Sequence, residues 1–510
     1  MTEVMAIEQS VKQEKDTEIT VNPTTHIVDF TEGDVANPLN WRPPYKRSIV
    51  VLVASFSAVV QLSTIIAAPV SPSILIDFHS NNALYRTLIV SIWELGEIVA
   101  PLIWGPLSEL YGRRWVLNIA NALFIAFHAG TALSTNIQML IAFRFLSGAA
   151  TASLPIGPGI VRDLFEEERR GRAMSIMSLT TTLGVVAGPI VGSYLGEREG
   201  WRWAFWLPTI VAGALALLLL ALYRETYQVT ILKRKAKQRR RETGNMNLRS
   251  KYETEAGETD ASAASKLFDA FIRPLRLLVR SPILILITVY ISVVYGYVYL
   301  MMTTIAPVFQ EIYGFSTGTS GLCFLGLCLG LALGAFICSF LLDRYIRLAK
   351  ARASARASAG AAAQQTSPDD SSPITPEHRL PPVLFSCIFM SSGFFLFGWT
   401  VHAHVHFIVP IIGTAVIGLG LVATTISLQT YIVDVFGIYA VSATSAMLVP
   451  RNASAAFLPL AGPPLFHKLG YHWGGTLLGL VVLAFAVMPM GFMRWGGRLR
   501  GRYGTGYSEG

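Results

Sequence analysis

Long apolar stretches, separated by short polar connections, constrain the fold of this 510-residue chain more than any other feature. Only 14% of its residues are charged, whereas soluble domains carry about 25%. A helix of about 20 apolar residues crosses the ~30 Å hydrocarbon core of a bilayer. The chain is therefore predicted to be an all-α membrane protein with 12 transmembrane helices. The expected helices lie at about 47–69, 85–107, 116–134, 138–161, 173–195, 202–223, 281–306, 317–342, 382–401, 407–433, 438–466 and 474–494.

Four short patterns occur in both halves of the chain, in the same order. An insert rich in Ala, Ser and Pro at about 344–380 accounts for the larger offset of the later matches. A hydrophobic chain that repeats itself in this way is typical of two-lobed transporters, so we expect two pseudo-symmetric six-helix bundles. The matched pairs are 108–113 and 342–347, 161–165 and 433–436, 188–189 and 462–463, and 200–203 and 470–473.

The polar segments indicate how the chain is oriented and divided. Alternate loops are rich in Lys and Arg, and such loops face the cytosol, so both termini and the central loop are predicted to be cytosolic. Residues 1–36 lack hydrophobic periodicity and are expected to be disordered, whereas Lys266 to Arg280 is expected to form an amphipathic surface helix. The expected organisation is a cytosolic tail at 1–45, bundles at 46–223 and 281–495, a central loop at 224–280, a flexible loop at 344–380 and a cytosolic tail at 496–510.

A ten-residue polar cluster between the second and third helices is the strongest local signal. It requires a close backbone approach at Gly105, a tight turn at Gly112 and an acid, Glu109, beside two guanidiniums. Glu109 can lie near the N-terminus of a neighbouring helix, where the helix dipole stabilises an anion, and such a contact can act as a gate. A plain cytosolic turn is the alternative. The predicted gating residues are Gly105, Glu109, Gly112, Arg113, Arg114, Asp163, Asp343, Arg344 and Asp434.

Three charged residues are expected inside the first bundle. Burying an ionisable group in a bilayer costs at least ~2.5–3.5 kcal/mol, so such groups are paired or functional. Glu94 and Glu97 lie three residues apart on the second helix, and counting along the helices places Arg144 at a depth similar to that of Glu94. Our hypothesis is a protonatable pair in which proton uptake by a carboxylate frees Arg144. The alternative is that either acid has a static packing role.

The fifth helix carries small residues on one face. Gly184, Gly188 and Gly192 are spaced by four, which lets another helix approach closely, and Pro189 introduces a bend. Ordinary helix packing explains this pattern equally well.

Taken together, these motifs resemble a known family. Gly105–Arg114 resembles the helix-2/3 signature of the major facilitator superfamily, and with residues 37–41, 200–206, 225–227 and 376–381 the chain resembles fungal twelve-helix drug:proton antiporters. The resemblance implies the fold of that superfamily and a proton-coupled secondary transporter that exports drugs, toxins or secondary metabolites by alternating access.

The resemblance also implies roles for particular residues. The pattern from Gly184 to Gly192 resembles the antiporter signature, although Ser175 and Ser193 replace two family glycines, and Arg144-x-x-x-Gly148 resembles the helix-4 signature. The central helices would contribute the substrate cavity, for which aromatic, weakly polar walls suit amphipathic molecules. The candidate cavity residues are Tyr295, Tyr299, Gln429, Tyr431 and Arg451.

Other function classes receive little support from the sequence. No Walker sequence occurs, and no hydrolase or zinc-protease motif indicates an enzyme. His128 is interpreted as a satisfied packing residue, and His402, His404 and His406 are not expected to bind metal. The expected partners are a small organic substrate, protons and the lipid bilayer, with no cofactor and no nucleic acid, in a monomer. The expected location is the plasma membrane, with a vacuolar membrane as the alternative, and proton-coupled uptake or polyamine transport is the alternative function.

Overall fold

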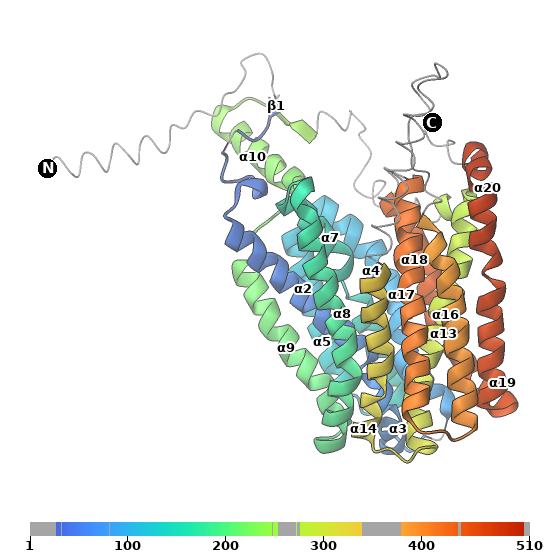
Figure 1. Ribbon diagram of the computed structural model, residues 1–510. Helices are drawn as coiled ribbons and strands as arrows, with labels where there is room; N and C mark the ends of the chain where they lie inside the picture. Colours follow the sequence, from blue (N-terminus) through green and yellow to red (C-terminus); the bar gives the residue numbers. More distant parts are fainter. Residues whose placement is uncertain are drawn as a thin grey trace, which may run out of the picture.

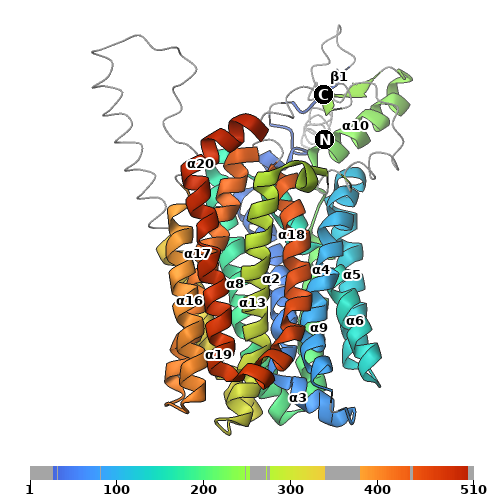
Figure 2. The same ribbon diagram turned by 90° about the vertical axis from the view of Figure 1, so that its right-hand side faces the viewer.

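The computed structural model describes residues 27–31, 33–80, 82–246, 248–252, 272, 276–338, 379–436 and 440–503. The described part is almost entirely helical, and its long helices stand side by side in one upright bundle (Figures 1 and 2). Helix α10 (Gln228–Thr243) projects from one end, which we call the α10 end, and α3 (Ala67–Asp77) lies at the opposite end, the α3 end.

The N-terminal half of the chain, the N lobe, crosses the bundle with six passes. Two of the passes are interrupted, one between α2 and α3 at Ile66, and one between α6 and α7 at Ala150–Ala152. The helices are α2 (Pro43–Ile65), α3, α4 (Ala83–Tyr111), α5 (Arg113–Ala132), α6 (Ile137–Ala149), α7 (Ser153–Leu164), α8 (Glu167–Arg198) and α9 (Trp201–Leu222).

The C-terminal half, the C lobe, also makes six passes. Eleven segments of the described residues are long and apolar enough to span a membrane, and the last of them, Ala443–Trp495, has 53 residues. The backbone turns inside it at Gly470 (φ 73°), so this segment contains two passes, and the predicted 12-helix fold is confirmed in the described part of the chain. The helices are α13 (Pro282–Glu311), α14 (Thr317–Leu322, within a span that continues to Cys338), α16 (Pro381–His402), α17 (Ile408–Phe436), α18 (Ala440–Phe457), η5 (Leu458–Ala461), α19 (Gly462–Ala484) and α20 (Val487–Tyr503).

Glycines set the closest helix contacts within the lobes. A Cβ at Gly184 would lie 2.1 Å from the carbonyl oxygen of Ala58, and those at Gly188 and Gly192 would lie 2.6 and 2.4 Å from the next carbonyls along α2. Because the three glycines share one face of α8, that face lies directly on α2. The four-residue spacing of these glycines therefore allows α8 to pack closely against α2 within the N lobe.

Large apolar side chains remain exposed on the outside of both lobes. Leu217 and Phe336 are 69% and 73% exposed, and many other leucines, isoleucines and phenylalanines are also uncovered. Such a surface would be unfavourable in water and suits contact with lipid hydrocarbon.

The chain before the first membrane helix is more ordered than the sequence predicts. Strand β1 (Ile27–Val28) pairs in parallel with β2 (Arg249–Ser250), and Val28 packs with Ala236 of α10. Asp34 also accepts a hydrogen bond from Lys235. The prediction of disorder over residues 1–36 is therefore wrong for residues 27–31 and 33–36, because these contacts come from a distant segment. Most of the predicted amphipathic helix at 266–280 and of the loop at 344–380 lies outside the described residues.

We expect Gly184→Ala to destabilise the protein. The new methyl group would overlap the α2 backbone, and overpacking of this kind typically costs ~1–3 kcal/mol. The measurement is the thermal unfolding midpoint of the purified protein in detergent. Gly213→Ala in α9 is the matched control, since no atom lies within 4 Å of a Cβ at that position. Equal midpoints for the two variants would contradict the packing assigned to α8.

Candidate functional site between the two lobes

The two lobes meet at the α3 end. The Arg86 guanidinium of α4 pairs with the Glu311 carboxylate of α13 at 2.9 Å, and Gln310 Nε2 donates to the carbonyl oxygen of Pro69 at 3.3 Å. Close by, α14 lies on α8, where a Cβ at Gly321 would lie 1.9 Å from the Ser193 hydroxyl oxygen. The lobes are therefore in direct contact at this end.

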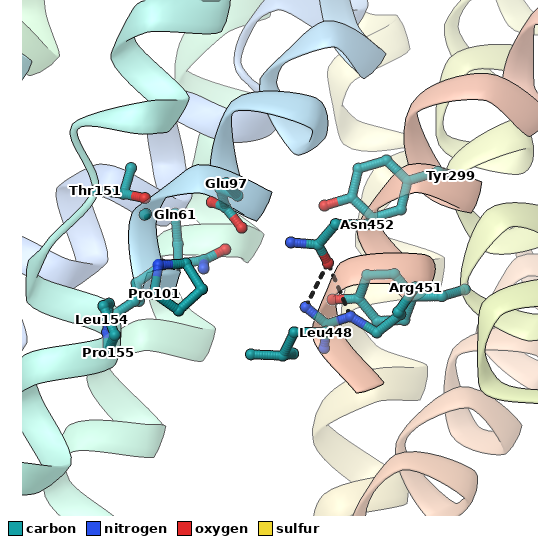
Figure 3. Close-up of a pocket in the computed structure, with 12 residues that line it drawn as sticks. Gln61, Glu97, Pro101, Thr151, Leu154, Pro155, Tyr299, Leu448, Arg451 and Asn452 are labelled. Carbon is teal, nitrogen blue, oxygen red and sulfur yellow. Dashed lines mark hydrogen bonds between the residues drawn. The ribbon is translucent and has the colours of Figure 1, made fainter. Parts of the chain in front are cut away.

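A cavity of about 210 Å³ separates the lobes farther from the α3 end (Figure 3). The N lobe contributes polar and small residues from three helices, and the C lobe contributes two tyrosines and a polar segment of α18. In Figure 3, Glu97 projects from one side and Arg451 from the other. The lining residues are Gln61, Glu97, Ala100, Pro101, Thr151, Leu154, Pro155, Tyr295, Tyr299, Leu448, Arg451 and Asn452.

A second cavity of about 190 Å³ adjoins the first, because Gln61, Tyr295 and Tyr299 line both. Its remaining walls are almost entirely apolar and include Leu331 and Leu421 of the C lobe. The space between the lobes therefore has a polar part beside an apolar part, which suits an amphipathic molecule.

Both acids of α4 lie at this site. Glu94 is 1% exposed and its Oε1 accepts a hydrogen bond of 2.6 Å from the Tyr299 hydroxyl of the C lobe. Glu97 Oε1 accepts one of 2.8 Å from the indole nitrogen of Trp93. The bond between Tyr299 and Glu94 therefore joins the two lobes in the middle of the protein, beside the cavity.

Glu94 and Arg144, which the sequence predicts to pair, are not bonded directly to each other in this structure. Among the described residues, Arg144 forms no ion pair; its guanidinium donates to the carbonyl oxygens of Ile89, Ser63 and Thr64 at 3.0, 2.7 and 2.7 Å and lies over the Trp93 ring. These bonds tie three passes of the N lobe together. Counting residues gives the depth of a side chain but not the direction in which it points around the helix.

The polar cluster at the α10 end is built around Arg113. Its Nη1 donates to the Ser108 hydroxyl at 2.6 Å, its Nε lies 3.4 Å from an Asp163 oxygen, and its guanidinium lies over the Tyr227 ring. Burial raises the pKa of the Tyr227 hydroxyl, so this ring remains neutral beside the arginine. The predicted gating residues Arg113 and Asp163 are thus brought together inside one lobe.

The acid at the start of α5 is Glu225, not Glu109. Glu225 Oε1 and Oε2 accept from the backbone N–H groups of Arg113 and Arg114 at 2.8 and 3.3 Å, where the helix dipole favours an anion. A Cβ at Gly112 (φ 97°) would lie 2.4 Å from Glu225 Oε2, which explains the glycine. Glu109 is exposed, and the close approach expected at Gly105 is absent, since no atom lies within 4 Å of a Cβ there.

Comparison with known proteins identifies the family. Residues 51–459 match the family model described as Major Facilitator Superfamily. The chain belongs to the Major Facilitator Superfamily.

Fungal members of the superfamily are similar over most of the chain. The efflux pump radE of Floropilus chiversii is 38% identical over 93% of this chain and 85% of its own length, and the MFS-type transporter penM of Penicillium rubens is 39% identical over 93% and 89%. The xylose transporter XylE of E. coli in a partially occluded inward-open conformation has a TM-score of 0.60, with 15% identity over 87% of this chain and 98% of its own. The relatives and the fold neighbours are transporters, and this protein is a membrane transporter, not an enzyme.

Two of the predicted cavity residues line neither cavity. Tyr431 is buried inside the C lobe beside Phe492, and Gln429 does not line either cavity. The Asp434 side chain, Asp343 and Arg344 lie outside the described residues. His128 is buried against Phe124, but neither ring nitrogen has a hydrogen-bond partner among the described residues, so it is not the satisfied packing residue that we expected.

Sequence reasoning missed three polar residues of the cavity. Gln61, Thr151 and Asn452 line it, and each stands inside a segment predicted to cross the membrane. A lone amide in an apolar helix is costly unless it faces a cavity or a partner, so this rule could have singled out Gln61 and Asn452.

The ion pair at the α3 end is expected to favour the closed state of that end. Arg86→Glu should shift the population toward lobe separation by up to about fivefold, because a partly exposed pair contributes ~0.2–1 kcal/mol. Spin labels at His79 and Thr319 would report the separation, since the four native cysteines are buried. Arg86→Glu with Glu311→Arg should restore the original distance distribution, and failure to do so would argue against the pair.

Glu225 is expected to stabilise the α10 end. Glu225→Ala leaves the first N–H groups of α5 without their acceptor, and loss of a helix cap typically costs ~0.5–2 kcal/mol. The thermal unfolding midpoint should fall for Glu225→Ala and less for Glu225→Gln. Glu109→Ala, which removes an exposed acid nearby, is the control and should leave the midpoint unchanged. An equal loss in both alanine variants would contradict the cap.

Proposed function

We propose that this transporter exports small organic compounds in exchange for protons, by alternating access. The observation that carries the proposal is the hydrogen bond from Tyr299 to Glu94, which joins the lobes at the edge of the cavity. Relatives that bear the names efflux pump and MFS-type transporter support the export of organic compounds.

The contacts between the lobes define what must change during transport. Opening the α3 end requires the Arg86–Glu311 pair and the Tyr299–Glu94 bond to break. Tyr299 also lines both cavities, so a substrate that enters from the α10 end contacts the residue that holds the lobes together. Substrate binding can therefore release the bond that keeps the α3 end closed.

The same bond couples this movement to protons. A hydrogen bond donated to a carboxylate favours its charged form, so Glu94 takes up a proton more readily once Tyr299 no longer donates to it. When the lobes separate at the α3 end, Glu94 loses this donor and binds a proton more readily from the outer side. Return of Tyr299 expels the proton toward the cytosol, which gives exchange of substrate for proton.

We place the protein in the plasma membrane, with the α10 end in the cytosol. The exposed Lys233, Arg234, Lys237 and Arg241 of α10 support this orientation. A fluorescent fusion in a fungal host would distinguish the plasma membrane from the vacuolar membrane.

Two alternatives share the fold. Proton-coupled uptake would move substrate in the opposite direction, and direct flux measurement separates it from export. Polyamine transport gains no support from this cavity, where Arg451 would repel a polycation that Glu97 attracts.

Glu94→Gln is expected to abolish the acceleration of export by a pH gradient. Tyr299→Phe should reduce that acceleration about tenfold, since a hydrogen bond to a charged group contributes ~1.5–3 kcal/mol. The assay uses proteoliposomes with the compound that accumulates inside a deletion strain of a fungal host. Tyr297→Phe, two residues from Tyr299 on α13, is the matched control and should retain full dependence. Export that the gradient accelerates equally in Glu94→Gln and the unmodified protein would refute the assignment.

A further inference from the structure

We infer that the substrate carries an uncharged, dipolar head group, with a hydrogen-bond donor and an acceptor, on an apolar ring system. A hydroxyl and a carbonyl on one polycyclic compound meet this description. The inference rests on the proposed function, because it assigns the cavity between the lobes to the transported molecule.

Arg451 offers the acceptor of the substrate a binding site. Its Nε and Nη2 both donate to Asn452 Oδ1, at 2.9 and 2.8 Å, and its guanidinium lies 4.2 Å from the centre of the Tyr295 ring. Among the described residues Nη1 donates to no group, and Arg451 forms no ion pair although it lies in the middle of a membrane helix. A cation in that position needs an acceptor, and the cavity is where one can enter.

Glu97 offers the donor of the substrate a binding site on the opposite wall. Trp93 occupies one carboxylate oxygen, and among the described residues Oε2 accepts no hydrogen bond. Figure 3 shows Glu97 and Arg451 on opposite sides of the cavity, and no ion pair joins them. A molecule between them can therefore accept from one and donate to the other.

Glu97 and Arg451 place groups of opposite charge on these two walls. A monovalent cation would be attracted by Glu97 and repelled by Arg451, and an anion would meet the reverse, while both would lose their hydration on entry. A neutral group with a donor and an acceptor satisfies both walls without this cost.

The apolar body has its place in the adjoining cavity. Tyr295 and Tyr299 form the boundary between the two cavities, and beyond them lie Val185, Leu331 and Leu421 from both lobes. A flat ring system can stack on a tyrosine while its far edge displaces water from the aliphatic walls.

Four probes with one ring system test the inference on the purified full-length protein in nanodiscs. They are 2-(hydroxymethyl)anthraquinone, the neutral donor and acceptor; 2-(aminomethyl)anthraquinone, the cation; anthraquinone-2-carboxylate, the anion; and 2-methylanthraquinone, which lacks the donor. Quenching of tryptophan fluorescence gives each affinity. The hydroxymethyl probe should bind at least about tenfold more tightly than the other three.

Two variants test the assignment of the walls by reducing this preference. Arg451→Gln should raise the relative affinity of the cation about tenfold, and Glu97→Gln that of the anion by a similar factor. Glu311→Gln is the charge-matched control, since Glu311 lies at the α3 end away from the cavity, and it should leave the ranking unchanged.

Three results would overturn the inference. They are tighter binding of the cation or the anion by the unmodified protein, a ranking that neither cavity variant alters, and no binding of any probe. The assay contains no proton gradient, so it remains informative if export or proton exchange fails in the proteoliposome experiment. A successful export experiment with a charged compound would overturn this inference and leave the proposed function in place.

Discussion

Charged groups inside a membrane need partners, and in this protein the nature of each partner differs from one charge to the next. Arg144 donates to three backbone carbonyl oxygens and lies over the Trp93 ring, which fixes it inside the N lobe. Glu94 takes a tyrosine hydroxyl from the other lobe, so its partner can leave when the lobes move. Arg451 takes a side-chain amide and an aromatic ring, neither of which carries a charge. The need of a buried charge for a partner therefore explains all three arrangements. Arg144 is fixed within its lobe, Glu94 forms a bond that can break, and Arg451 stays open to the cavity.

Close helix packing determines where movement can occur. The glycine face of α8 lies on α2 with backbone contact, so these two helices move as one body. Ser193, on the same helix, meets Gly321 of the other lobe through a hydroxyl group. The α8–α14 contact between the lobes therefore involves a hydroxyl side chain, while the α2–α8 contact within the N lobe is made by backbone atoms.

The sequence was most informative about features that depend on residues close together in the chain, such as the membrane-spanning helices. Runs of apolar residues predicted the passes, and the repeated Gly470 pattern marked the turn between the last two. It was least informative where residues from distant segments meet. Tyr299 was predicted as a cavity wall, but its bond to Glu94 depends on how two lobes pack, which no local pattern encodes. The carbonyl acceptors of Arg144 could not be identified by counting residues along the helices. Glu225 was noticed only as part of a resemblance, because its contacts lie about 110 residues away.

The small sheet of β1 and β2 attaches the segment before α2 to the rest of the N lobe. The sheet joins the segment that precedes α2 to the segment that follows α10. The chain before the first pass of the N lobe and the chain after its last pass are therefore held together. The Tyr45 hydroxyl, which donates to the carbonyl oxygen of Leu222 at 2.6 Å, adds a second fastening close to the helices. A fluorophore attached near Asp29 would consequently move together with the first six passes. Its distance to a dye on the C lobe would then report the rotation of one lobe relative to the other.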